Sequence, residues 1–255
     1  MMKRVNYNEV ARVYDQRYST NRLVGIEDCL QTWTRQVKAR RVLEVGCGTG
    51  HWLTSLRECD FRCGLDYSAG MLGKARQKDG ALRLVQGTAM QSPFGSDAFD
   101  LVFCINAIHH FPDPAVFIQE ARRILKKGGL LTIIGMDPLT EPDRWYLYDY
   151  FPGTCETDRG RYPSGKMIQQ WMKEAGFQTS ERQPAGHINH DFVGREVLDD
   201  PILQKNGTSQ LALLTDDAFQ AGMARIMEAV QLAESCGEQI VFPTHIALPA
   251  VIGYA

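Results

Sequence analysis

The sequence has no marked excess of charge of either sign. Its 28 lysines and arginines and its 30 aspartates and glutamates leave a formal net charge of −2. Proteins that hold nucleic acids by the phosphate backbone carry a strongly basic surface, which needs a larger share of lysine and arginine. We therefore expect no nucleic-acid partner.

The sequence also lacks long apolar runs and paired cysteines. No stretch contains the roughly 18 consecutive apolar residues that indicate a membrane-spanning helix, and residues 1–25 contain no apolar segment typical of a signal peptide. Its seven cysteines include no CxxC pair, and their spacing matches neither a zinc site nor a small secreted disulfide framework. We expect a cytoplasmic protein without a membrane partner.

Between residues 24 and 135 the sequence alternates between short β-branched runs and amphipathic segments. This periodicity predicts strands at 41–45, 62–66, 82–85, 99–106 and 130–135. It predicts helices at 24–38, at 51–58, at 68–78 with Ser68 as a candidate cap, and from the cap residue Asp113 to the pair Gly128-Gly129. Alternating strands and helices pair in parallel through right-handed crossovers. The expected fold class is therefore α/β, with helices on both faces of the sheet.

The pattern changes after residue 135. Aromatic residues are frequent in 137–163, which we interpret as a cap. The expected elements that follow are a helix at 165–176, a strand at 177–182, a helix at 215–236 and one or two strands at 240–252. Residues 184–238 are interpreted as a helical insertion, since long insertions late in an α/β sheet usually form a lid or a partner surface.

A glycine-rich loop, Gly46-Cys47-Gly48-Thr49-Gly50, follows the first expected strand. Glycines here allow a tight turn and let a ligand approach the backbone closely. Dinucleotide-binding loops have the spacing GxGxxG and hold a pyrophosphate, whereas this loop has the spacing GxGxG. Glu44, just before the loop, would repel a pyrophosphate and would suit a cationic ligand. The pattern disfavours a nicotinamide dinucleotide, and a plain βα turn is the alternative.

Asp66 ends the second expected strand about twenty residues later, where an acid binds ribose hydroxyls in folds of this type. A nucleoside that carries a positive group instead of phosphates would suit both Glu44 and Asp66. Four segments, 42–50, 64–72, 87–94 and 120–135, together resemble the successive motifs of class I S-adenosylmethionine-dependent methyltransferases. The resemblance covers roughly residues 35–135, and it implies a Rossmann-like, seven-stranded mixed sheet whose last strand is antiparallel.

The resemblance implies that S-adenosylmethionine is the cofactor and S-adenosylhomocysteine the product. The residues then expected around the cofactor are Tyr14, Tyr18, Glu44, Gly46, Cys47, Gly48, Asp66, Tyr67, Met71, Thr88, Ala89 and Asn106. Glu44 would lie near the ammonium, Asp66 would bind the ribose hydroxyls, and Met71 would pack beside the adenine. Thr88 departs from the family, which usually has Asp here. Tyr14 and Tyr18 would belong to a flap, residues 1–23, at the start of a cofactor-binding domain 1–135; residues 136–255 would complete the protein.

Several of these residues have plainer alternatives. Asp66 could cap the following helix. Met71 and Ala89 could belong to the core, and Tyr14 and Tyr18 could be a hydrophobic pair on a terminal helix.

Two histidines, His109 and His110, follow the fourth expected strand at the sheet edge where ligands bind. Either is a candidate general base if the acceptor must lose a proton; packing at a helix start is the alternative. The cluster His187, His190 and Asp191 lacks a further type of ligand, so we expect no metal.

These observations predict methyl transfer to a small-molecule acceptor, at an oxygen, nitrogen or carbon atom that the sequence does not identify. The small size of the chain and its aromatic cap favour a small molecule over a polymer. An alternative is a non-catalytic regulatory or scaffold protein that binds S-adenosylmethionine or S-adenosylhomocysteine. The helix at 215–236 could pack in the cap or on a second subunit, so we expect a monomer or a homodimer.

Overall fold

The computed structural model describes residues 5, 7–10, 14–16, 18, 23–140 and 143–255. The expected flap, residues 1–23, lies partly outside this range. The strands are β1 (Arg41–Val45), β2 (Phe61–Asp66), β3 (Arg83–Gln86), β4 (Phe99–Ile105), β5 (Leu125–Ile134), β6 (Arg144–Trp145), β7 (Thr179–Val193) and β8 (Val241–Tyr254). The helices are α1 (Tyr7–Val10), α3 (Ile26–Gln36), α4 (Ala69–Lys78), α5 (Pro114–Ile124), α6 (Tyr146–Tyr150), α7 (Thr154–Arg161), α8 (Gly165–Glu174), α9 (Ser209–Ala212) and α10 (Asp216–Cys236).

These strands form one mixed sheet, as expected for a Rossmann-like α/β fold. Its order is β3-β2-β1-β4-β5-β8-β6, and β7 pairs with β8 as well. Strands β1 to β5 are parallel, and β8 is antiparallel to β5. Seven strands of four residues or more carry the sheet, and the two-residue strand β6 is the eighth. The antiparallel last strand is confirmed.

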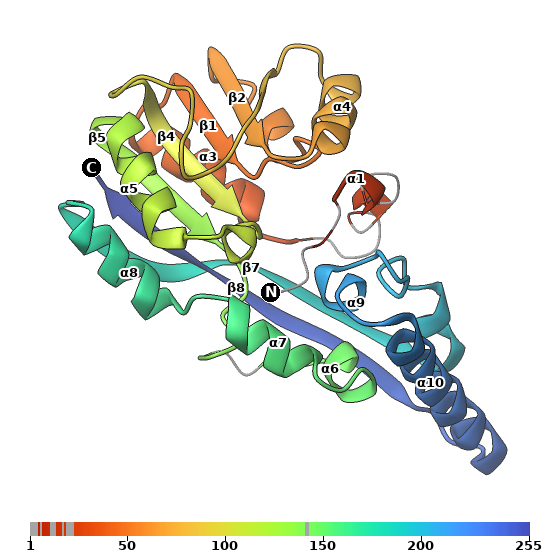
Figure 1. Ribbon diagram of the computed structural model, residues 1–255. Helices are drawn as coiled ribbons and strands as arrows, with labels where there is room; N and C mark the ends of the chain where they lie inside the picture. Colours follow the sequence, from red (N-terminus) through yellow and green to blue (C-terminus); the bar gives the residue numbers. More distant parts are fainter. Residues whose placement is uncertain (1–4, 6, 11–13, 17, 19–22, 141–142) are drawn as a thin grey trace.

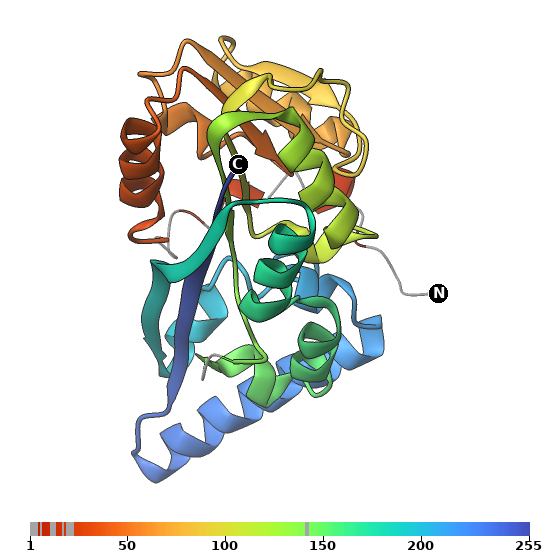
Figure 2. The ribbon, with the colours of Figure 1, turned by 90° about the vertical axis from the view of Figure 1, so that its left-hand side faces the viewer.

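Helices cover both faces of the parallel part. Strand residues point alternately to opposite faces, so Val42 packs with Ile26 and Leu30 of α3, whereas Leu43 packs with Phe117 and Ile118 of α5. Beyond this part, β7 and β8 run on as a long ribbon beside which α6, α7 and α10 lie (Figure 1). Figure 2 shows α10 crossing the far end of this ribbon.

The expected end of the helix that begins after Asp113 was wrong. Helix α5 ends at Ile124, and β5 begins at once with Leu125, so the pair Gly128-Gly129 lies inside a strand. Gly128 has a φ of 78°, and the pairing of β4 with β5 is irregular between Phe99 and Leu101. A left-handed residue within a strand is typical of a bulge. The glycines therefore accommodate a bulge and do not end the helix.

Part of the expected insertion is a strand. Residues 184–193 continue β7, which pairs with β8 from Thr179 to Val193, and the helical region begins at Gly194. Nine of the fifteen residues of β7 are polar, and only Ala185 and Phe192 are buried, so the strand does not show the usual apolar alternation. The helix expected at 51–58 is also wrong, because only a 3-10 turn at Leu53–Ser55 forms there.

The caps expected at Ser68 and Asp113 are confirmed. The Ser68 hydroxyl accepts the Met71 N–H at 3.1 Å, and Asp113 accepts the N–H groups of Ala115 and Val116. These interactions connect residues two or three apart, so the local sequence suffices to predict them.

A fully buried carboxylate, Asp158, ties the cap together. It accepts hydrogen bonds from the Tyr148 hydroxyl and the Gln210 side-chain amide, both at 2.8 Å, and pairs with the Arg161 guanidinium at 2.8 Å. These partners come from α6, α7 and α9. The network therefore fixes three short helices that have few residues of their own to pack.

We expect Asp158→Ala to lower the free energy of unfolding by about 3–5 kcal/mol, because it leaves a buried guanidinium without its partner. Urea denaturation followed by circular dichroism measures this. Asp149→Ala, on an exposed position of α6, is the matched control and should stay within about 0.5 kcal/mol of the parent. An equal effect of the two substitutions would contradict a structural role of the network.

Candidate functional site

The glycine loop follows β1 directly, and its three glycines have left-handed backbone conformations. Gly46, Gly48 and Gly50 have φ values of 74°, 52° and 69°, a region that side chains rarely adopt. The Gly46 N–H donates to the carbonyl of Leu65 at 2.8 Å, and a Cβ at Gly46 would lie only 2.5 Å from Cβ of Ala107. Glycine is therefore required at this position by both conformation and space.

Asp66 holds the loop from the end of β2. One carboxylate oxygen accepts the Gly48 N–H and the other accepts the Ser68 N–H, each at 2.8 Å. Helix α4 is capped by Ser68, so Asp66 is not its N-cap. A carboxylate accepts about four hydrogen bonds, so Asp66 retains capacity for a ligand hydroxyl. Burial raises the pKa of its carboxyl group.

Glu44 is a carboxylate buried beside this loop, with 1% of its surface exposed. Its Oε2 has no hydrogen-bond partner among the described residues. Burial, followed by the nearby charge of Asp66, raises the pKa of Glu44 well above its ordinary value. A buried acceptor without a partner is costly, and a cationic group placed there would remove that cost.

The N-terminal segment lies against the loop from outside. The Thr49 hydroxyl donates to Asp15 at 2.6 Å, and the rings of Tyr18 and His51 stack with centroids 3.8 Å apart. A Cβ at Gly48 would be 3.8 Å from the ring of Tyr14. The structure thus brings Tyr14 and Tyr18 to the loop, where the flap was expected.

Met71 is buried on the same side. Its side chain packs in a small cluster with the partly buried Val5, Tyr7 and Tyr14, and α1 lies beside α4 (Figure 1). Met71 is therefore close to the loop, although its contacts also fit the core alternative.

The other expected cofactor residues differ in how they can contribute. Cys47 is buried against Gly64, and burial raises the pKa of its thiol, so only its backbone faces a ligand readily. Tyr67 is 78% exposed and Thr88 is exposed as well. Ala89 packs at the edge of the α5-side core. This supports the core alternative for Ala89.

The two candidate histidines lie in different surroundings. The Tyr7 hydroxyl and Nε2 of His110 are 2.6 Å apart, so His110 contacts the N-terminal segment. The ring of His109 stacks on Tyr162 of the cap, with centroids 3.8 Å apart. Burial, and then the charges of His110 and Arg161, hold the pKa of His109 well below its ordinary value. His109 is therefore a neutral imidazole at neutral pH.

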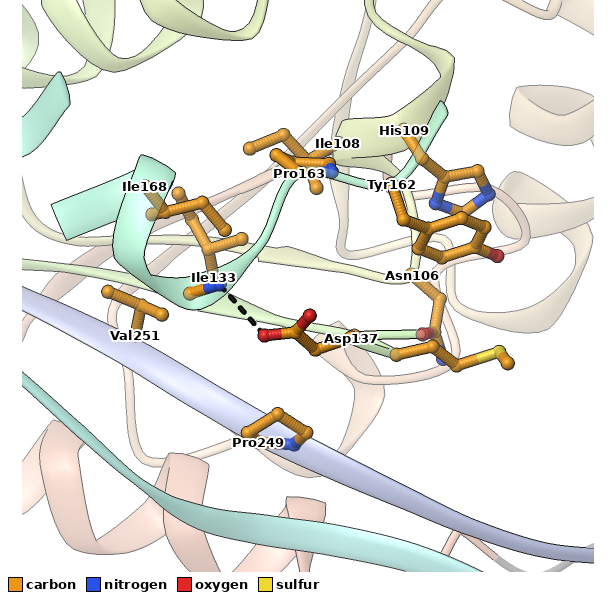
Figure 3. A pocket seen from close by; sticks show the side chains of 13 residues that line it. Asn106, Ile108, His109, Ile133, Asp137, Tyr162, Pro163, Ile168, Pro249 and Val251 are labelled. Carbon is orange, nitrogen blue, oxygen red and sulfur yellow. Dashed lines mark hydrogen bonds between the residues drawn. The ribbon is translucent and has the colours of Figure 1, made fainter. Parts of the chain in front are cut away.

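A small pocket opens at the carboxyl ends of β4 and β5 (Figure 3). Polar groups of Asn106, His109, Tyr162 and Asp137 share it with apolar side chains. Asn106 has a left-handed φ of 49° and its N–H donates to Ile134 at 2.8 Å. Sequence reasoning missed Asp137, although its place after the fifth strand, at the ligand-binding edge, was an available signal.

No cluster of three or more potential metal ligands occurs among the described residues. His187 and His190 are three apart on β7 and so face opposite sides of the ribbon, and Asp191 pairs with His245 at 2.8 Å. Within the described part of the chain, no helix is both long and apolar enough to cross a membrane.

Comparison with known proteins supports the resemblance drawn from the sequence motifs. Residues 43–133 match the sequence profile of a methyltransferase domain. These matches support a class I S-adenosylmethionine-dependent methyltransferase family for the chain. Among the curated relatives of this chain is the demethylmenaquinone methyltransferase of Staphylococcus epidermidis, which is 27% identical over 192 residues, 69% of this chain and 78% of the relative.

Solved structures share the fold. A putative methyltransferase from an antibiotic biosynthesis pathway of Anabaena variabilis has a TM-score of 0.73 at 21% identity, covering 92% of this chain and 98% of that one. Phosphoethanolamine N-methyltransferase 2 of Haemonchus contortus, solved with phosphomonomethylethanolamine and S-adenosylhomocysteine, has a TM-score of 0.55 at 19% identity, covering 97% of this chain and 57% of that one.

The lack of room for a side chain at Gly46 can be tested through the stability of the protein. Gly46→Ala should lower the free energy of unfolding by roughly 2 kcal/mol or more, because its φ is positive and Ala107 is too close. Gly73→Ala, in α4 with open space around it, should instead stabilise by up to about 1 kcal/mol. Urea denaturation of both variants provides the comparison, and a neutral Gly46→Ala would contradict the tight turn.

Proposed function

We propose that this methyltransferase transfers the methyl group of S-adenosylmethionine to a small-molecule acceptor held between the glycine loop and the cap. The observation that carries the proposal is the unpartnered carboxylate oxygen of Glu44, buried beside the left-handed turn. An acid in that position suits the ammonium of an amino acid. The curated relative that acts on demethylmenaquinone supports a small molecule as the acceptor.

Different residues around the loop contact different parts of the proposed cofactor. Glu44 takes the ammonium, the backbone of Gly46 to Gly48 approaches the amino-acid part, and Asp66 takes the ribose hydroxyls. Met71 packs beside the adenine, whose amine lies toward Thr88, with Ala89 and Tyr67 at the margin. Asn106 lies toward the methionine portion. The N-terminal tyrosines, Tyr14 and Tyr18, cover the site from outside.

A sulfonium group supplies an already activated methyl group. What remains for the protein is to align the acceptor and to exclude water. The N-terminal segment on the loop serves the second task, since its rings pack on His51 and Met71. We assign proton acceptance, where the acceptor needs it, to the neutral imidazole of His109 and not to His110, whose Nε2 contacts Tyr7.

Thermal unfolding can distinguish binding of an adenosyl cofactor from binding of a nicotinamide dinucleotide. S-adenosylhomocysteine at about 100 times its dissociation constant should raise the unfolding midpoint by roughly 5–10 °C, whereas NAD should leave it unchanged. Asp66→Ala, compared with its own ligand-free midpoint, should lose most of that rise. A rise with NAD and none with S-adenosylhomocysteine would replace the proposal with a nicotinamide-dependent one.

The raised pKa of Glu44 makes ligand binding release protons. In the free protein this carboxyl holds a proton well above its ordinary range, and an ammonium beside it would lower the pKa again. Binding of S-adenosylhomocysteine should therefore release protons at pH values below the raised pKa of Glu44, and its affinity should rise with pH up to that pKa. Calorimetry in buffers of different ionisation enthalpy measures the released protons.

Glu44→Gln should abolish this proton release and weaken binding by roughly tenfold or more. Glu58→Gln, an exposed position, is the matched control and should leave both quantities as they are. Undiminished proton release from the Glu44→Gln protein would show that another group, and not Glu44, meets the ammonium.

A further inference from the structure

The pocket beyond Asn106 adjoins the glycine loop. Asn106 lines it, and the next residue, Ala107, packs directly on Gly46. On its other side it is bounded by the start of α8 and by β8, through Gly165 and Pro249 (Figure 3). A group in this pocket would therefore lie next to the proposed cofactor site and beneath the cap.

The pocket is too small for a whole acceptor. Its volume is about 20 Å³, the space of roughly one water molecule or one polar group. Apolar side chains form much of the wall, namely Ile108, Ile133, Pro163, Ile168, Pro249 and Val251. Such a space admits the polar end of a molecule while the carbon frame remains outside.

Asp137 presents an unpartnered oxygen at this pocket. The side chain is almost fully buried, with 3% of its surface exposed. Its Oδ2 accepts the Gly165 N–H at 2.9 Å and lies 3.6 Å from the Arg182 guanidinium. Its Oδ1 has no partner among the described residues. The contacts with Gly165 and Arg182 account for the burial of Oδ2. No contact accounts for the burial of Oδ1.

The surrounding charges select the kind of group that Oδ1 would bind. The Arg182 guanidinium already offsets the negative charge of Asp137. His109, whose Nδ1 is also buried without a partner, is neutral, and Arg161 beyond it is paired with Asp158. The pocket therefore offers no uncompensated charge to an ammonium or a carboxylate. It offers acceptor atoms to a neutral hydrogen-bond donor.

We propose that Asp137 is a specificity residue for the methyl acceptor, and that it binds a hydroxyl group carried on an apolar carbon frame. This inference rests on the proposed function, because it gives the acceptor its place beside the glycine loop. The hydroxyl donates to Oδ1 of Asp137, and the apolar walls exclude competing water.

Four naphthalene derivatives with the same frame test the preference. Naphthol carries a neutral donor, methoxynaphthalene no donor, acetylnaphthalene an acceptor and naphthylmethylamine a cation. Calorimetric titration of each into the wild-type protein saturated with S-adenosylhomocysteine should show naphthol binding at least about tenfold more tightly than the other three. This ranking needs no variant.

Asp137→Asn should invert the preference. The Gly165 N–H still requires an acceptor, so the amide oxygen will face Gly165 and the amide nitrogen will take the place of Oδ1. Naphthol should then lose about tenfold in affinity, and acetylnaphthalene should gain. Asp149→Asn, the same change at an exposed position of α6, should keep the wild-type order.

Equal binding of the four probes, binding of none, tighter binding of naphthylmethylamine, or an unchanged order in Asp137→Asn would each overturn the role of Asp137. Titration of S-adenosylhomocysteine alone is made first and should give the same affinity for wild type and Asp137→Asn. If that ligand fails to bind the wild type, the proposed function itself fails, which is a different result from failure of the probes.

Discussion

The left-handed turn after β1 is the constraint on which the rest of the site depends. Gly46, Gly48 and Gly50 all have positive φ, and Asp66 accepts the N–H of the middle one. The turn therefore fixes β1 to the end of β2. It also fixes the end of β4, because Ala107 packs where a side chain of Gly46 would be. Both the proposed cofactor site and the pocket beyond Asn106 take their positions from this one turn, and at Gly46 the turn leaves no room for a side chain.

Three buried carboxylates show that burial alone does not identify a ligand-binding residue. Asp158 is fully buried and has four close hydrogen-bond contacts, with Tyr148, Arg161 and Gln210. These contacts are sufficient to explain why Asp158 is buried, so its role is structural. Glu44 and Asp137 are almost as buried, yet each has an oxygen without a partner among the described residues. An unsatisfied buried acceptor costs about 1–3 kcal/mol. Folds rarely retain that cost without a use, and both oxygens lie at the carboxyl edge of the sheet, where ligands bind.

The sequence predicts what short-range interactions determine. The glycine turn and the Ser68 cap depend on residues close in the chain, and Asp66 was expected from its spacing after the glycine loop. All three are where the pattern indicated. Long-range pairing decides the rest. The pair Gly128-Gly129 resembles a helix end until the pairing of β4 with β5 shows a bulge, and residues 184–193 are a strand only because β8 lies beside them. Asp137 is distinguished by Gly165 and Arg182, residues far away in sequence.

The two unpartnered carboxylates differ in the charge that surrounds them, and this difference separates their ligands. Asp66 lies near Glu44 and adds a second negative charge, so that end of the site attracts a cation. Asp137 has Arg182 beside it, so the other end is close to neutral. A sulfonium carries a positive charge on the atom that gives up the methyl group, and a cationic acceptor would be repelled by it at short range. A neutral acceptor avoids that repulsion. The charge balance around Asp137 and the charge of the proposed methyl donor therefore favour the same kind of substrate, although they arise from different residues.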